Sequence, residues 1–157
     1  MEMTSLVRNI ANVANLSTPL GLLVGALGGA RFSMHRSLVV ADQARLPSWI
    51  SASALTVGSV VVIPRRSLDQ VQSELPGLLR HEEHHAYQYS YCLGLPFIPL
   101  YFASAGWSWL RSGDRASANH FEKQADLQLG GYPRGQLRPL RAGLADLRNR
   151  VRRPRAR

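Results

Sequence analysis

The chain is poor in cysteine, in lysine and in long uninterrupted apolar runs. The first and third of these shortages argue against intrachain disulfides and against a transmembrane helix. Cys92 is the only cysteine in 157 residues, so no intrachain disulfide can form and nothing points to an oxidising compartment. We interpret Cys92 as a small buried residue of a helix rather than as a ligand or a nucleophile. Lys123 is the only lysine beside eighteen arginines, a bias that we assign to genomic composition before function.

The apolar stretch of residues 16–30 is interrupted by Pro19 and by four glycines. It is too short and too broken to predict a transmembrane helix. Arg8 precedes it, as a basic residue does in a secretion signal, but Glu2 and the internal proline argue against such a signal. We expect a buried or membrane-surface helix here, in a protein that is cytoplasmic or membrane-associated, and secretion stays open.

The net charge of +9 is concentrated at one end of the sequence. Residues 134–157 carry nine Arg and one Asp, a net charge of +8, whereas residues 1–133 carry ten basic and nine acidic groups, a net charge of +1. We therefore divide the chain into a domain of residues 1–133, with an apolar N-terminal helical segment, and an Arg-rich tail of residues 134–157.

Three interpretations of the tail follow from its composition. The first is a solvated, partly disordered end, because Leu144, Leu147 and Val151 form only a weak apolar stripe. The second is binding to an anionic membrane surface, helped by the apolar segments 16–30 and 93–110. Nucleic acid comes last, because no aromatic residues interleave with the arginines and no known binding module is present. Nothing in the pattern predicts an oligomeric state.

The domain reads as an α+β fold, with a small sheet and helices that follow it. Strands are predicted for residues 38–41 and for residues 54–63, which are β-branched and end at Pro64. Gly58 in the second of these predicts a bulge or a hairpin turn. Helical patterns cover the remaining predicted elements, which are residues 1–15, a turn capped by Ser67, residues 76–92, and a segment from Ser117 or Asn119 to Leu129.

The helix predicted for residues 76–92 contains the sequence His-Glu-Glu-His-His, which fits the pattern H-E-x-x-H. Four residues make just over one helical turn, so His81 and His85 lie on one face and their imidazoles can meet one metal ion. Glu82 lies about 100° round the helix, where it could hydrogen-bond a metal-bound water without ligating the metal. These are the parts of a hydrolytic zinc site. We expect Glu83 and His84 to lie toward the surface.

A catalytic zinc ion usually takes three protein ligands, of which H-E-x-x-H supplies two. Glu122, on the next predicted helix, is the candidate for the third. Asp126 follows one turn later and could hydrogen-bond the free ring nitrogen of a ligand histidine. The alternative is a charged helix whose histidines only form hydrogen bonds, although two buried histidines without a metal or partners would be unfavourable.

His81-Glu82-x-x-His85 followed by Glu122-x-x-x-Asp126 resembles the HExxH…ExxxD signature of the gluzincin zinc metallopeptidases. The segment Phe121–Asp126 is similar to the E-x-x-A-D segment of the membrane-linked heat-shock and CAAX-processing proteases of that group. The resemblance covers about residues 50–131 and is strongest to small bacterial domains with the same order of parts. It implies an α+β fold in which a small sheet packs on an active-site helix and a second helix supplies a carboxylate ligand.

The resemblance implies zinc ligands at His81, His85 and Glu122 and a general base at Glu82. It also implies an edge strand at residues 54–63 that receives a peptide or protein substrate. A residue that stabilises the oxyanion cannot be assigned, and His120 and Tyr132 are candidates only. The expected function is a zinc-dependent metallopeptidase. The alternatives are a zinc-bound binding or regulatory module without catalysis and a membrane-associated Arg-rich adaptor without metal.

Overall fold

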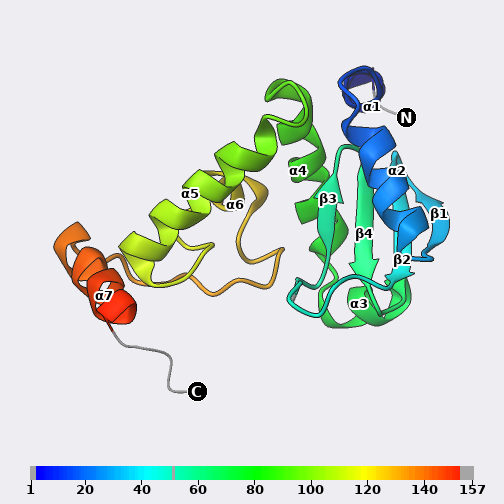
Figure 1. The fold of residues 1–157 in the computed structure, drawn as a ribbon. Coiled ribbons are helices and arrows are strands. Elements are labelled where there is room, and N and C mark those ends of the chain that lie inside the picture. Colours follow the sequence, from blue (N-terminus) through cyan, green and yellow to red (C-terminus); the bar gives the residue numbers. More distant parts are fainter. Residues whose placement is uncertain (1–2, 51, 153–157) are drawn as a thin grey trace.

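The computed structural model describes residues 3–50 and 52–152, apart from the side chains of Met3 and Val151. Over these residues the chain forms seven α-helices and a four-stranded mixed sheet, which confirms the predicted α+β class (Figure 1). The end of the Arg-rich tail, residues 153–157, and the Val151 side chain of its predicted apolar stripe lie outside the described residues.

The sheet has the strand order β1-β2-β4-β3, and its strands are β1 (Arg31–His35), β2 (Leu38–Ala44), β3 (Leu55–Val57) and β4 (Val60–Pro64). The pair β2–β4 is parallel, and the other two pairs are antiparallel. Gly58, at a φ of 64°, opens the two-residue turn between β3 and β4, so the predicted hairpin turn is confirmed. Strand β1 was not predicted, because four of its five residues are exposed and no alternation marks it.

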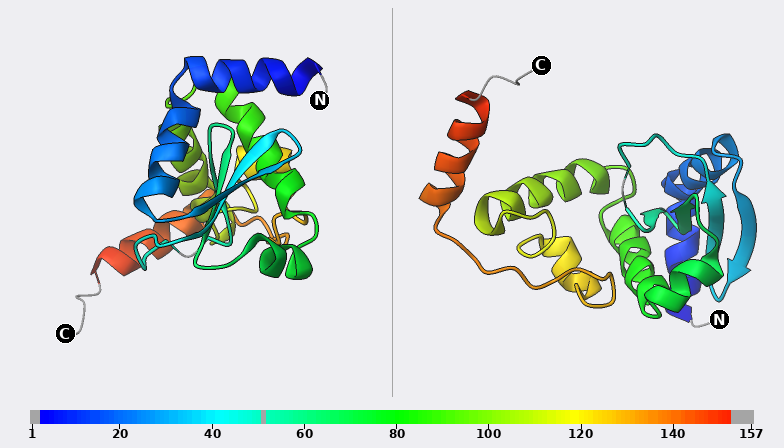
Figure 2. Two further views of the ribbon diagram at one scale, coloured as in Figure 1. Left: turned by 90° about the vertical axis from the view of Figure 1, so that its right-hand side faces the viewer. Right: turned by 90° about the horizontal axis from the view of Figure 1, so that it is seen from below.

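Helices cover both faces of the sheet. Along β4, Val61 and Ile63 pack with the side chains of α4 (Leu78–Tyr91) and α3 (Leu68–Glu74), whereas Val60 and Val62 lie in the cluster that includes Val24 of α2 (Ser17–Leu27). Successive residues of a strand point to opposite faces, so α2 and α4 lie on opposite sides of the sheet. Ser67 caps α3 as predicted, with Gln70 completing a capping box. Helix α1 (Met3–Ala14) crosses one end of the sheet (Figure 2).

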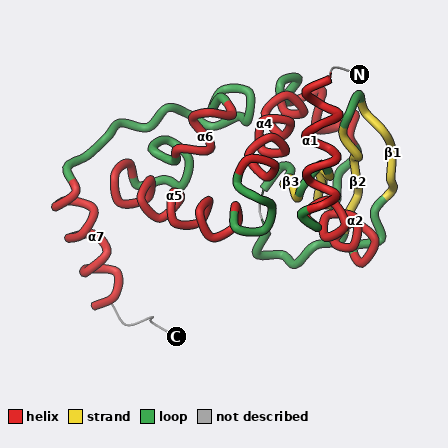
Figure 3. Tube along the Cα trace, turned by 90° about the horizontal axis from the view of Figure 1, so that it is seen from above, coloured by secondary structure: helices red, strands yellow, loops and turns green. Residues whose placement is uncertain are grey.

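The second half of the chain is helical and reaches away from the sheet (Figure 3). It comprises α5 (Phe97–Ser112), α6 (His120–Ala125) and α7 (Leu140–Arg152). Helix α6 packs against α4, and α7 packs on α5, where a Cβ at Gly143 would lie 2.0 Å from the carbonyl oxygen of Leu110. Most of the described tail is therefore a helix docked on α5 rather than an irregular end.

The helix predicted to reach Leu129 is shorter than expected. Helix α6 ends at Ala125, and Asp126 follows it with a φ of 67°. A positive φ interrupts the helical path, so Glu122 and Asp126 do not share a helix face as their spacing predicted.

No single helix among the described residues is long and apolar enough to cross a bilayer. Residues Thr4–Ala14 of α1 and Ser17–Leu27 of α2 pass the same criterion only together, as a pair bent by 75°.

Candidate metal centre

Three side chains from two helices converge at the interface between α4 and α6. His81 and His85 project from successive turns of α4, and Glu122 projects toward them from α6. The Nε2 atoms of the two histidines are 3.1 Å apart, and Nε2 of His81 lies 3.1 Å from Oε2 of Glu122. Nε2 of His85 lies 3.7 Å from Oε1 of the same carboxylate. One potential ligand atom from each residue lies within 4.8 Å of the others, and all three residues are buried.

The outer nitrogens of both rings face groups that can only accept hydrogen bonds. Nδ1 of His81 lies 3.0 Å from the backbone carbonyl oxygens of Ala125 and Asp126. Nδ1 of His85 lies 2.7 Å from Oε1 of Gln88, whose amide is oriented by the bond from its Nε2 to the carbonyl of Phe121. Each Nδ1 therefore carries the hydrogen, and each neutral ring presents its Nε2 lone pair to the same point.

Two imidazole lone pairs and a carboxylate that face one another can hold a cation between them. Oε2 of Glu122 is buried without a hydrogen-bond partner. A buried carboxylate oxygen left in this state is strongly disfavoured unless a positive charge compensates it. Two nitrogens and one carboxylate form the donor set of catalytic zinc sites, in which a fourth position is left for water or substrate. The residues present therefore fit a zinc ion.

When no metal is bound, a proton on Nε2 of His81 can take the place of the cation and supply the hydrogen bond that Oε2 of Glu122 otherwise lacks. Burial alone would lower the pKa of His81, but the hydrogen bond with Glu122, the negative charges of Glu82 and Glu122 and the hydrogen bond with the backbone of Asp126 together outweigh burial, and the pKa is raised. The opposite balance holds for Glu122. Burial would raise its pKa, but the hydrogen bond with His81, the charge of His85 and the hydrogen bond from Tyr101 together lower it. The pair thus favours the charged form of both partners.

Glu82 is buried beside the three convergent residues without joining them. Its Oε2 accepts a hydrogen bond of 2.8 Å from Oγ1 of Thr56 in β3, the strand at the edge of the sheet. The carboxylate is close enough to the centre that its charge raises the pKa of both His81 and Tyr132. A strand thus fixes the carboxylate that the sequence predicts as a general base.

Aromatic residues from α5 and from the loop after α6 pack around the centre. The hydroxyl of Tyr101, on α5, donates a hydrogen bond to Oε1 of Glu122, and burial raises the pKa of Tyr101. Phe97 packs 6.3 Å from His85 between ring centroids. Tyr132, a predicted oxyanion candidate, lies 5.9 Å from the ring of His81, and burial raises its pKa to about 12. A tyrosine that keeps its proton can donate a hydrogen bond to a nearby anion.

His120, the other oxyanion candidate, is exposed at the first position of α6 and packs its ring against Phe121. The structure does not bring it to the three convergent residues, because its side chain leaves the helix on a different side from Glu122. Among the described residues, Tyr132 is therefore the predicted candidate that contacts the centre.

In this structure the Asp126 carboxylate does not reach the outer ring nitrogen of His81 or of His85. Its Oδ1 accepts a hydrogen bond from the backbone N–H of Gln128, and the residue is exposed. The backbone carbonyls of Asp126 and Ala125 orient His81 instead. The reason is the end of α6, because the positive φ of Asp126 turns its carbonyl inward and its side chain outward.

Four residues of the site were missed at the sequence level, namely Thr56, Gln88, Tyr101 and Gly130. Gln88 was detectable, because it lies three residues after His85 on the same helical face. Gly130 permits the loop after α6 to approach α4 closely, since a Cβ at this position would lie 2.6 Å from the ring of His81. Thr56 and Tyr101 depend on how β3 and α5 fold over α4, and no local pattern signals that.

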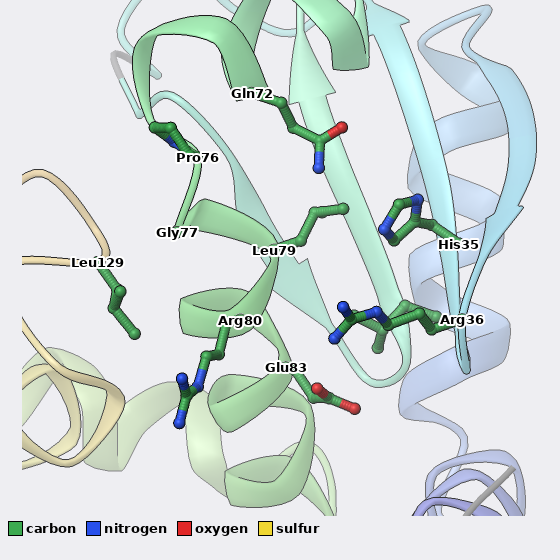
Figure 4. A pocket seen from close by; sticks show the side chains of 10 residues that line it. His35, Arg36, Gln72, Pro76, Gly77, Leu79, Arg80, Glu83 and Leu129 are labelled. Carbon is green, nitrogen blue, oxygen red and sulfur yellow. The ribbon is translucent and has the colours of Figure 1, made fainter.

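The two described cavities lie away from the convergent residues. One, of about 420 Å³, lies behind α4, where Leu79, Arg80 and Glu83 face the turn that carries His35 and Arg36 (Figure 4). The other, of about 750 Å³, lies between α5, α6 and the start of the tail. Neither is lined by His81, His85, Glu122 or Glu82.

No family model, curated protein or solved structure matches the chain. The resemblance to gluzincins therefore stays a hypothesis based on motifs. The functional argument rests on the geometry of the centre and on the chemistry of its side chains.

Proposed function

We propose that the protein is a zinc-dependent hydrolase that cleaves peptide bonds. The observation that carries this proposal is the convergence of two Nε2 lone pairs and the Glu122 carboxylate beside a separate buried carboxylate, Glu82. Structural zinc sites use four protein ligands, whereas a set of three with an adjacent acid or base is typical of catalytic ones. Bound zinc would acidify a water molecule and polarise the carbonyl group of the substrate.

In this proposal Glu82 is the group that moves the proton. Thr56 holds one oxygen of its carboxylate, which leaves the other oxygen to accept a proton from the attacking water. Glu82 then returns that proton to the leaving amine. Tyr132 keeps its own proton because its pKa is raised to about 12, and its hydroxyl can therefore donate to the negative oxygen that develops on the carbonyl carbon.

Strand β3 supports a peptide as the substrate class. It is one of the two edge strands of the sheet and packs directly against α4. Val57 and Val60 are the hydrogen-bonded pair that closes the two-residue turn. Hydrogen-bonded and non-hydrogen-bonded pairs alternate in an antiparallel sheet, so the backbone N–H and C=O of Thr56 point away from β4. An extended peptide could pair with these groups beside Glu82.

A second candidate, a zinc module without catalysis, is favoured by the closure of the centre. His81 and Glu122 are each only 2% exposed, and Tyr101 hydrogen-bonds the oxygen of Glu122 that faces His85. In such a module zinc would stabilise the contact between α4 and α6. Activity measurements separate the two candidates.

Metal analysis of the purified full chain is the first test. We expect about one zinc per chain, and loss of zinc in His81→Ala, His85→Ala and Glu122→Gln. His84→Ala is the matched control, since Nδ1 of His84 bonds the carbonyl of Arg80 on its own helix. No stoichiometric zinc in the wild type, or equal zinc in all variants, would refute both zinc proposals.

Peptide cleavage is the second test, with a broad fluorogenic peptide library and the zinc-loaded protein. Glu82→Gln should keep its zinc and lose at least about a hundredfold in rate, which is the contribution of a general base. If the wild type and Glu82→Gln both hold zinc and are equally inert across the library, the centre is a non-catalytic module.

A further inference from the structure

Helix α1 turns its polar side inward and its apolar side outward, the reverse of a helix on a water-soluble domain. Ser5, Arg8 and Asn12 face the protein and are at most 6% exposed. The large apolar side chains of the opposite face are between 43% and 63% exposed, and they are Leu6, Val7, Ile10 and Val13.

The inward side of α1 is locked by specific polar contacts. The guanidinium of Arg8 lies 2.9 Å from Oε1 of Glu83 on α4 and donates from Nη2 to both oxygens of Ser37. Nδ2 of Asn12 donates to the carbonyl of Ala86 at 2.9 Å. Rolling the helix over to hide its apolar face would break the ion pair between the buried Arg8 and the partly buried Glu83 and leave the Arg8 charge without a partner. The outward orientation of the apolar face is therefore fixed.

Helix α2 also exposes large apolar side chains, but its buried side is made of small residues. Its buried residues are all small, and they are Ser17, Thr18, Gly21 and Gly25. A Cβ at Gly21 would lie 2.4 Å from the carbonyl oxygen of Val57, so the helix rests almost directly on the sheet. Leu22, Leu23 and Leu27 point outward, with Leu27 80% exposed, whereas Leu20 and Val24 are partly buried against the core. Small residues inside and large apolar residues outside characterise helices that pack in lipid, where burying leucine brings no gain.

The exposed apolar faces of the two helices adjoin at Leu16, and we call them together the α1–α2 face, which comprises Leu6, Val7, Ile10, Val13, Leu16, Leu22, Leu23 and Leu27. The two helices meet at a bend of 75°, with α1 across one end of the sheet and α2 along one of its faces (Figure 2). The turn between α4 and α5 extends this face, because Gly94 packs against Asn15 and the flanking Leu93 is 77% exposed. Scattered exposed leucines are ordinary, but a contiguous face of this kind marks an interaction site.

The charges around the α1–α2 face match a bilayer rather than water or an acidic partner. Arg8 is the only charged residue from 3 to 30, and it is buried. Exposed arginines border the face. Arg36 adjoins Ser37, which α1 contacts, while Arg31 and Arg45 lie at the end of α2, where the N–H of Arg45 bonds the carbonyl of Gly28. Apolar residues at the centre with cationic residues at the border suit acyl chains surrounded by anionic headgroups.

We propose that the α1–α2 face docks the protein on the surface of an anionic lipid bilayer. Helix α1 lies in the interface, and the outward leucines of α2 enter beside it. Twelve and eleven residues give helices of about 18 Å and about 16 Å, each shorter than the hydrocarbon core of about 30 Å, so the pair inserts without crossing. This docking is independent of the proposed hydrolysis.

Vesicle flotation of the full chain tests the proposal, with vesicles of phosphatidylcholine alone and with one part phosphatidylglycerol in three. We expect the wild type to float, more strongly with phosphatidylglycerol at low salt. The double variant Val7→Glu, Ile10→Glu should bind at least about tenfold less, because charge on the apolar face opposes insertion. The matched control is Trp49→Glu, Leu137→Glu, which changes two exposed apolar residues elsewhere by the same net charge.

Further variants and measurements keep the proposal falsifiable. Arg31→Gln, Arg36→Gln and Arg45→Gln should each weaken binding to the phosphatidylglycerol vesicles about fivefold. His81→Ala should float like the wild type, so failure of the zinc proposal leaves this one intact. A wild type that stays unbound on both vesicles overturns docking, as does a glutamate variant that floats normally. A dimer by light scattering that the glutamate pair dissociates, without flotation, assigns the face to a second copy and also overturns it.

Discussion

Replacement of Gly130 by alanine should displace the ring of His81 in the proposed metal centre while leaving all three proposed ligands in place. A Cβ on Gly130 would lie 2.6 Å from Cε1 and 2.8 Å from Nε2 of His81. Ordinary contact begins at 3.4 Å, so the ring must retreat by about 0.8 Å. Zinc–nitrogen bonds near 2 Å vary by only about 0.2 Å. The ring of His81 cannot retreat freely, because Nδ1 is held by the carbonyls of Ala125 and Asp126.

We expect Gly130→Ala to weaken zinc binding about a hundredfold, the upper range for changes that disorient a ligand. With free zinc at about 100 times the wild-type Kd, binding stabilises the wild type by about 2.7 kcal/mol, or a rise in Tm of about 5–11 °C for a chain of this size. At the same zinc concentration the variant would gain only about 0.4 kcal/mol, a rise of about 1–2 °C.

The assay compares Tm with chelator and with buffered zinc for each protein. The metal-free variant should also melt lower, because crowding a packed site costs about 1–3 kcal/mol. The zinc-induced rise is therefore the decisive quantity, not the absolute Tm. Gly106→Ala is the matched control, since its Cβ would meet nothing within 4 Å. A full zinc-induced rise in Gly130→Ala would refute the argument that this glycine places the ring of His81.

Three further predictions concern the support of the centre. Thr56→Val should keep its zinc and lower the peptidase rate about tenfold or more, measured on zinc-loaded protein, because the hydroxyl that positions Glu82 is lost; an unchanged rate would remove Thr56 from the mechanism. Gln88→Leu should weaken zinc binding about 10–100-fold in competitive titration, because the side chain of Gln88 contacts the ring of His85. Asp126→Asn should leave zinc binding unchanged, because the side chain of Asp126 bonds the backbone of Gln128 instead. Weaker zinc binding in Asp126→Asn but not in Gln88→Leu would support the role first predicted for Asp126. In the metal-free protein the raised pKa of His81 stabilises the folded state. This stabilisation is fully present below pH 6.5, the ordinary pKa of histidine, and is lost as the pH rises through the raised pKa. His81→Ala should therefore make Tm less dependent on pH across that range.

Local sequence patterns predicted the helices that carry the candidate centre better than they predicted where those helices end. The spacing of His81 and His85 places them on one face of any helix, so their convergence follows from geometry that the chain cannot avoid. Glu122 was chosen as a carboxylate on the next predicted helix and by its place in the ExxxD pattern, and the packing of α6 against α4 brings it to the two histidines. Asp126 was misplaced because the end of α6 depends on a single positive φ, which neither composition nor periodicity reveals.

The amphipathic pattern of α1 was detected, but its direction could not be. A helical repeat of apolar residues says which side chains share a face, not whether that face meets protein or solvent. The direction is decided at long range by Glu83, Ser37 and Ala86, which give the polar side of α1 partners distant in the sequence.

These partners also connect the two proposals in one element. Glu83 and Ala86 lie on the same helix as His81 and His85 but contact α1 from other sides of α4. In the two proposals, α4 carries the metal centre on one side and contacts the interfacial helix α1 on another, which fixes the distance between the centre and the bilayer. The range of substrates within reach of Glu82 is then limited by that distance, so segments that emerge close to a bilayer are the peptides to test first.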